Sequence, residues 1–156
     1  MNNRLTRRFI LKNTENLKNL NFSIPIRYER YYINDNLRIQ KKHDIYEKQV
    51  LMDNNIVSRE KIDINEFEDL KKKAYKEIIR DSYLYLDDEK ISIKKYYGMY
   101  EGLIRIEVKF KTEIEMKEYQ RLIWMGEEIT DSLLAFDRDL SKLDRELFLK
   151  ELNKYI

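Results

Sequence analysis

Apolar and polar residues alternate with a period of two along most of the chain, which is the pattern of β-strands. The pattern is cleanest at Leu103–Phe110, where apolar side chains alternate with Arg105, Glu107 and Lys109. Such alternation means that one face of the strand packs on a core while the other meets solvent or a wet cavity. The same pattern predicts further strands at Arg4–Leu11, Ile24–Ile33, Leu37–Met52 (turning at His43-Asp44), Ile56–Ile64, Tyr83–Leu86 and Ile91–Tyr97.

Other segments repeat their apolar residues at helical spacing. The first runs from Asn65 to about Asp81, capped by Asp63 or by Asn65 itself, and has its apolar residues at Phe67, Leu70, Ala74 and Ile78. A second helix opens with the capping-box spacing of Thr112 and Glu115. The tail from Asp139 onward is amphipathic through Leu140, Leu143, Leu147 and Leu152.

Seven or eight strands with few helices predict an α+β fold built on an antiparallel β-barrel. We expect this barrel to be closed or nearly closed, a tunnel that leaves no exposed strand edges. Helices should flank it, with an amphipathic helix at the C-terminus. At 156 residues the chain fits a single domain, 1–156, with 138–156 as a helical tail.

Composition narrows the class of protein. The 31 basic and 29 acidic residues nearly cancel, which argues against a general nucleic-acid binder, since these usually have a clear basic excess. The chain has no cysteine, so disulfides and thiolate metal sites are excluded. The sequence contains no recognisable signal peptide and no apolar run that could span a membrane, so we expect a cytoplasmic location. The oligomeric state stays open, a homodimer included.

Several segments resemble the CYTH, or triphosphate tunnel, superfamily. Tyr97–Phe110 resembles the family's turn, Gly-Leu pair and strand with an acidic end, and Trp124–Asp131 resembles its W-x-G-x-E-V-T element. Leu37–Gln40 resembles its R-x-R strand, with Gln40 in place of the second arginine. The best-matched region is Lys90–Ser132. All three glycines of the chain lie within it, which indicates that backbone geometry requires them there. The family includes class IV adenylate cyclases, thiamine triphosphatases and inorganic triphosphatases.

The resemblance implies a catalytic Mg²⁺ or Mn²⁺ held by acidic residues, but most of those acids are replaced here. Where the family has its first E-x-E-x-K strand, this chain has Arg4, Thr6 and Arg8, and an expected aspartate falls at Lys94. The later E-x-E reads Glu107-Val108-Lys109. Glu107 is therefore the main candidate catalytic and metal-binding residue, helped by Glu29 or Glu60 if the strand register differs, which is a thin ligand set for a hard cation.

Basic residues dominate the face that should point into the barrel. The predicted phosphate-binding set is Arg4, Arg8, Arg30, Arg38, Arg59, Lys61, Arg80, Lys94, Arg105 and Lys109. Crowded cations in a poorly screened interior repel one another unless an anion lies among them. Arginine forks grip phosphate with paired hydrogen bonds. The alternative is that half of these side chains lie on the outer face, paired with the equally abundant acids.

These observations leave open hypotheses of different classes. The first is a protein that binds a phosphate-rich small molecule, such as a nucleotide, an oligonucleotide or inorganic polyphosphate, needs no cofactor for this, and has weak or no catalysis. The second is a metal-dependent triphosphatase or nucleotidyl cyclase. The third is an interaction scaffold that meets its partner through the helical tail. The number of carboxylates inside the barrel separates the first two, and an exposed apolar stripe at Leu140, Leu143 and Leu147 would favour the third.

Overall fold

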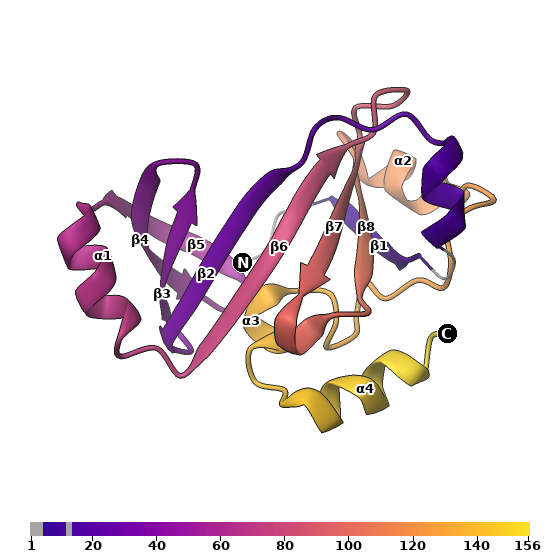
Figure 1. Cartoon of the computed structure of the whole chain (residues 1–156). Coiled ribbons are helices and arrows are strands. Elements are labelled where there is room, and N and C mark those ends of the chain that lie inside the picture. The colour runs from indigo at the N-terminus through magenta and orange to yellow at the C-terminus, as the bar shows by residue number, and fades with distance from the viewer. Residues whose placement is uncertain (1–4, 12–13) are drawn as a thin grey trace.

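The computed structural model describes residues 5–11 and 14–156, and within them an eight-stranded antiparallel sheet forms the framework (Figure 1). Its strand order is β1-β8-β7-β6-β2-β3-β4-β5. The sheet confirms the predicted α+β class with an antiparallel sheet. The strands are β1 (Thr6–Ile10), β2 (Ile26–Asn34), β3 (Leu37–Lys42), β4 (Ile45–Met52), β5 (Asn55–Lys61), β6 (Lys76–Leu84), β7 (Ile91–Tyr97) and β8 (Ile104–Lys109).

Across the described residues the sheet is strongly curved but its end strands do not pair with each other, so the prediction of a closed or nearly closed barrel is confirmed in its antiparallel strands and not in full closure. In the described part of the chain the end strands β1 and β5 each pair with one strand only. The free edge of β1 is instead covered by a later segment: the Ile10 amide donates to the Glu127 carbonyl at 2.9 Å, and the Ile129 amide donates to the Arg8 carbonyl at 2.8 Å. Residues that follow the sheet in sequence thus protect its edge in place of β5.

Short helices complete the fold. They are η1 (Thr14–Asn19), α1 (Ile64–Lys71), η2 (Gly98–Tyr100), α2 (Glu113–Glu118), α3 (Asp137–Leu140) and α4 (Arg145–Asn153). Of these, α1, α2 and α4 each begin at a capping side chain. The Asp63 side chain accepts from the Glu66 amide and Thr112 accepts from the Glu115 amide, as the sequence predicts. Along the described residues no helix has the length and apolar character needed to cross a membrane.

The predicted long helix from Asn65 to Asp81 is wrong in its second half. The helix α1 ends at Lys71, and Lys76–Leu84 forms the central strand β6, paired with β2 on one side and β7 on the other. Ile78, placed on the helix by its spacing from Phe67, is instead part of β6 and is fully buried in a core of the sheet. Hydrogen bonding to two neighbouring strands outweighs local helical spacing here.

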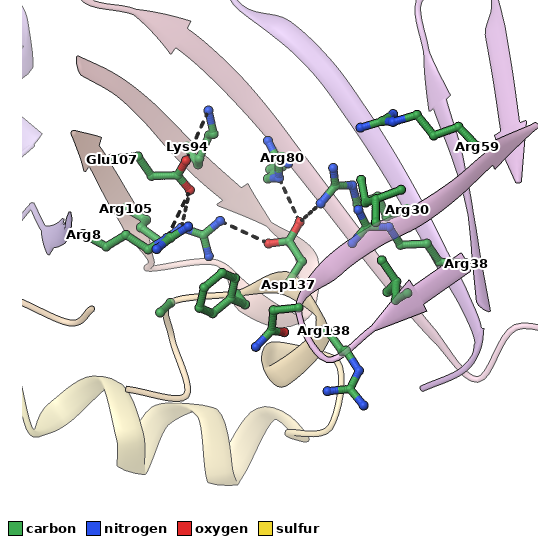
Figure 2. A pocket seen from close by; sticks show the side chains of 15 residues that line it. Arg8, Arg30, Arg38, Arg59, Arg80, Lys94, Arg105, Glu107, Asp137 and Arg138 are labelled. Carbon is green, nitrogen blue, oxygen red and sulfur yellow. Dashed lines mark hydrogen bonds and ion pairs between the residues drawn. The ribbon is translucent and has the colours of Figure 1, made fainter. Parts of the chain in front are cut away.

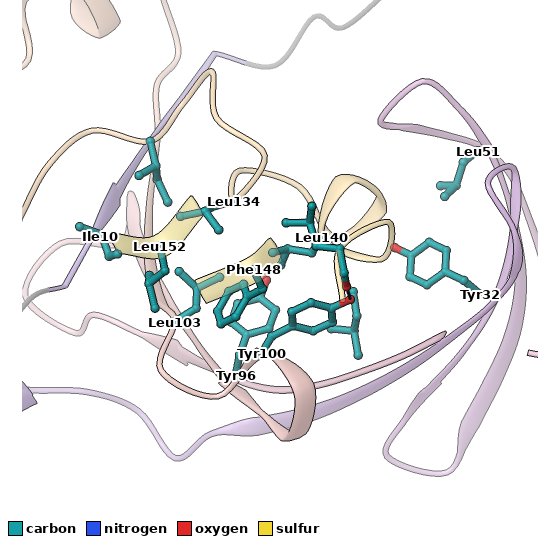
Figure 3. Close-up of a cluster of buried hydrophobic side chains, with 13 residues drawn as sticks. Ile10, Tyr32, Leu51, Tyr96, Tyr100, Leu103, Leu134, Leu140, Phe148 and Leu152 are labelled. Atoms are coloured by element: carbon teal, nitrogen blue, oxygen red, sulfur yellow. Dashed lines mark hydrogen bonds between the residues drawn. The ribbon is translucent and has the colours of Figure 1, made fainter. Parts of the chain in front are cut away.

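Each face of the sheet has a cluster of buried apolar residues. On the concave face, the inner core joins Tyr96, Tyr100 and Leu103 to side chains from the segment 129–152, among them Leu140 and Phe148 (Figure 3). On the convex face, a second cluster buries the side chains of β8 that alternate with the charged ones, Ile104, Ile106 and Val108. The alternation predicted for this strand is confirmed, and its charged side chains face the concave side.

In the C-terminal segment, α3 lies inside the curve of the sheet (Figure 1), and the buried side chains of α4 join the inner core (Figure 3). Leu140 and Leu143 are buried in the inner core, whereas Leu147 is 48% exposed. The apolar stripe that an interaction scaffold would present is therefore mostly covered by the protein itself. Two of the three glycines take conformations that other residues rarely adopt, with φ of 67° at Gly98 and 110° at Gly102.

Candidate functional site

The concave face of the curved sheet forms a trough. Arginine side chains from strands on its opposite sides line a cavity of about 140 Å³ (Figure 2). Because side chains alternate along each strand, the concave face receives every second residue. Within the described residues the cavity lining contains two carboxylates, Glu107 and Asp137, against eight basic side chains. The basic residues are Arg8, Arg30, Arg38, Arg59, Arg80, Lys94, Arg105 and Arg138.

Most of the predicted phosphate-binding residues lie together in this cavity. Arg8, Arg30, Arg38, Arg59, Arg80, Lys94 and Arg105 all line it. Lys109 is exposed and lines an adjoining cavity of about 350 Å³ together with Arg8 and Glu107. Lys61 is exposed at the end of β5 and is not part of the cavity wall, and Arg4 lies outside the described residues. The alternative of an even division between the two faces does not hold for this set.

Glu107 lies on β8 among cations rather than among other acids. Its carboxylate is 3.0 Å from Arg105 Nε, 3.8 Å from Arg8 Nε and 4.0 Å from Lys94 Nζ. Burial alone would raise the pKa of Glu107, but the fields of Arg105, Lys94 and Arg8 prevail and lower this pKa to about 2. The carboxylate is therefore ionised at every physiological pH, and the surrounding positive charge opposes the approach of a metal cation.

Asp137, at the start of α3, is the second carboxylate of the cavity, and sequence reasoning missed it. Its side chain is 1% exposed, and it accepts from Arg30 Nη1 at 2.8 Å, from Arg80 Nε at 3.0 Å and from the Tyr96 hydroxyl at 2.5 Å. Arg105 Nη2 lies 3.4 Å away. Burial favours the neutral form, yet these arginines hold the pKa of Asp137 well below its usual value.

Polar residues on the neighbouring strands hold the remaining guanidinium groups. Arg38 donates to Gln49 Oε1 at 2.7 Å and to the Tyr32 hydroxyl at 2.9 Å. Arg30 Nε donates to Gln40 Oε1 at 2.8 Å. Gln40, which stands where the resembled family has a second arginine, thus orients an arginine of the next strand. Glu47 accepts from Arg59 Nη1 at 2.8 Å and is a third carboxylate on the concave face, in an adjoining cavity.

The cavity has more positive charge than its own acids neutralise. Burial, together with the fields of Arg38 and Arg80, lowers the pKa of Arg30 to about 9. Burial also lowers the pKa of Lys94 to about 8, helped by the fields of Arg80, Arg105 and Lys109 against the opposing field of Glu107. A lowered pKa in a cation means that the folded protein disfavours its charge. An anion placed here would reverse that effect.

A divalent metal does not fit the residues present. Mg²⁺ and Mn²⁺ prefer several hard oxygen ligands with access to water. Glu47, Glu107 and Asp137 each already accept from arginine, and Glu107 is surrounded by cations. Among the described residues no group of three or more His, Cys, Asp or Glu side chains is placed to hold a metal ion. The lining of this cavity instead offers mainly cationic hydrogen-bond donors.

Adjoining cavities extend this charged surface along the trough. One of about 290 Å³ shares Arg30, Arg59, Arg80 and Lys94 with the first and adds Tyr28 and Lys42. The Tyr28 ring is faced by the Arg80 guanidinium at 4.6 Å and by the Lys42 ammonium at 5.4 Å, so cations lie over this aromatic side chain. The basic surface is therefore longer than the central cavity and offers mainly hydrogen-bond donors.

Comparison with known proteins connects this geometry to solved structures. No family model matches the sequence, and no curated protein is significantly similar to it. The crystal structure of the inorganic triphosphatase NE1496 has a similar fold, with a TM-score of 0.71 and 17% identity over 87% of this chain and 95% of that one. A second structure of NE1496, described as a hypothetical protein, gives a TM-score of 0.72 at 17% identity, over 88% of this chain and 96% of that one. This chain shares its fold with the NE1496 structures, which is consistent with the resemblance to the triphosphate tunnel superfamily seen in the sequence.

Proposed function

We propose that this protein binds a triphosphate- or polyphosphate-bearing anion in its basic trough and that it needs no metal ion to do so. The observation that carries the proposal is the excess of eight basic side chains over two carboxylates around the central cavity, counted over the described residues. Linear phosphates present one or more negative charges per phosphoryl group, and arginine is suited to grip them through paired N–H donors.

The electrostatics of the cavity support an anionic ligand. Burial is the main cause of the lowered pKa values of Arg30 and Lys94, and the fields of neighbouring cations add to it, so both side chains would gain from an added negative charge. A bound phosphate group would supply that charge where solvent screening is weak. The fold shared with the structure of an inorganic triphosphatase is a further, coarser support for a phosphate-rich ligand.

Binding is tested most directly with inorganic tripolyphosphate in the presence of EDTA at low salt. Ligand at well above its Kd should raise the melting temperature by mass action. Calorimetry on Arg38→Ala should show affinity reduced roughly 10- to 100-fold, because a hydrogen bond to a charged group contributes about 1.5–3 kcal/mol. Lys41→Ala is the matched control, since Lys41 lies on the convex face and pairs with Glu29. No thermal shift at millimolar tripolyphosphate would refute the proposal.

The second candidate function is a metal-dependent triphosphatase or nucleotidyl cyclase, and the likeness to the inorganic triphosphatase NE1496 favours the triphosphatase of these two. The residues favour binding with weak or no catalysis, because Glu107 is held by cations and Lys94 and Lys109 lie beside it. With ATP or tripolyphosphate and excess Mg²⁺ or Mn²⁺, we expect turnover at least about a thousandfold below the ~10 per second of an ordinary enzyme. Turnover above about one per second that collapses in Glu107→Gln would instead establish an enzyme.

A further inference from the structure

We propose that Asp137 is a positioning residue of the anion site: a built-in carboxylate that keeps the guanidinium groups of Arg30, Arg80 and Arg105 converged on the cavity in the absence of ligand. This inference rests on the proposed function and specifies how the site is organised. Figure 2 shows Asp137 between these arginines, which come from β2, β6 and β8. The two Asp137 oxygens have different partners. Oδ2 accepts from Arg30 and Arg80, and Oδ1 accepts from the Tyr96 hydroxyl and lies 3.4 Å from Arg105 Nη2.

The contacts with Asp137 orient the arginines without using all of their N–H donors. Each of the three arginines directs one nitrogen at Asp137, and a guanidinium carries five N–H donors. Second partners on the same side chains fix the plane of each group: Gln40 for Arg30 and Ser82 for Arg80. Arg105 also donates through Nε to Glu107 and through Nη1 to the Leu134 carbonyl. By count, each arginine keeps at least two N–H donors for a ligand, while these contacts limit rotation of the group.

Without this carboxylate the arginines would repel one another. Arg38 and Arg80 already contribute to the lowered pKa of Arg30, so the like-charge repulsion is present even with Asp137 in place. Flexible arginine side chains relieve such repulsion by separating, and a ligand must then bring them back together. Pre-organisation of binding groups before the ligand arrives is a main source of affinity.

Asp137 is itself held firmly, which separates a positioning role from that of an anion displaced by the ligand. Its neighbours in sequence, Leu134 and Leu140, are fully buried in the inner core. The Tyr96 hydroxyl that donates to Asp137 belongs to a side chain of the same core. Moving Asp137 out of the cavity would require this core to open.

The test is calorimetry with tripolyphosphate and with orthophosphate on the wild type, Asp137→Asn and the control Asp81→Asn. Asp81 is also buried and accepts from an arginine and a tyrosine, Arg27 at 2.6 Å and Tyr97 at 2.9 Å, but on the convex face of β6. Positioning predicts that Asp137→Asn weakens tripolyphosphate by at least about tenfold and orthophosphate much less, because a single phosphate does not need converged arginines. Asp81→Asn should leave both affinities unchanged.

The sign of the change discriminates among the alternatives. If Asp137 were only a counter-charge, its removal would leave the cavity more positive and tighten the binding of both anions, which would overturn the inference. Unchanged affinities with a lower melting temperature would show a purely structural role and would overturn it as well. Failure of the wild type to bind tripolyphosphate would instead refute the proposed function itself.

A second variant keeps the inference testable if Asp137→Asn does not fold. Tyr96→Phe removes the hydroxyl that donates to Asp137 while retaining the buried ring and every charge of the cavity. We expect it to lower the ratio of tripolyphosphate to orthophosphate affinity in the same direction but less, by about two- to fivefold, because Tyr96 is one of several donors to the Asp137 carboxylate and the arginine contacts remain. An unchanged ratio in a folded Tyr96→Phe protein would contradict the positioning role.

Discussion

The concave face of the sheet has two halves with opposite chemistry. In one half, Tyr100, Leu103 and Phe148 pack into a core from which water is excluded. In the other half, the strands direct arginines into a cavity. Asp137 lies at the junction of the two halves, where it accepts hydrogen bonds from Tyr96 of the core and from Arg80 of the site. The comparison indicates a division of roles: burial in the apolar half stabilises the protein, and the basic half is held together at a cost in free energy.

Phe148→Ala should have the largest effect, because it removes a fully buried ring from the apolar half. Truncation of a buried phenylalanine typically lowers the free energy of unfolding by about 3–5 kcal/mol. Leu147→Ala, next in sequence but 48% exposed, should change it by less than about 1 kcal/mol. Urea unfolding of both variants tests this. Similar losses would mean that α4 does not anchor the inner core.

Glu107→Gln should reveal the ionic support of the basic half through its pH dependence. The folded-state pKa of about 2 is below the ordinary value of 4.5, so this group stabilises the protein above pH 4.5, and the contribution is lost as pH falls toward 2. The variant should be less stable than the wild type at pH 7 by on the order of 3 kcal/mol, with the gap closing toward pH 2. Glu113→Gln, in an exposed pair with Lys117, should cost less than about 0.5 kcal/mol at any pH.

The difference in free energy of unfolding between wild type and Glu107→Gln could instead be independent of pH. That result would show that the arginine and lysine neighbours do not lower the pKa of Glu107. It would also remove the electrostatic argument against a metal ion at Glu107. The measurement therefore bears on both candidate functions.

Lys94→Met should have a smaller effect of the opposite sign on stability. Because burial lowers the pKa of Lys94 to about 8, its charge destabilises the folded state fully below pH 8, and this penalty disappears as pH rises from 8 to 10.5. Replacement by methionine should raise the free energy of unfolding by about 1–2 kcal/mol at pH 7, the lost contact with Glu107 offsetting part of the gain. The gain should vanish toward pH 10.5.

The same Lys94→Met variant should bind tripolyphosphate less tightly than the wild type. Greater stability with weaker binding is the trade-off expected of a site residue that is costly to the fold. Loss of stability at pH 7 would instead place Lys94 among the groups that hold the protein together.

The sequence alone determined much of this protein. Alternation along β8 predicted which of its side chains would pack in a core and which would face solvent or a cavity. The capping residues Asp63 and Thr112 marked the starts of helices. These features are local, so they can be read from neighbours in the chain. The basic character of the concave face follows from the same alternation in several strands.

Only the tertiary structure decided the rest. The apolar spacing from Phe67 to Ile78 fits a helix, but pairing with β2 and β7 makes the second part a strand. Closure of the sheet was likewise not local, because it depended on whether β5 or the segment 126–129 would reach the edge of β1. Nothing beside Asp137 in the sequence marks it as part of the site. It reaches the arginines because Leu134 and Leu140 pack into the inner core, and a contact made by distant packing leaves no local pattern in the chain.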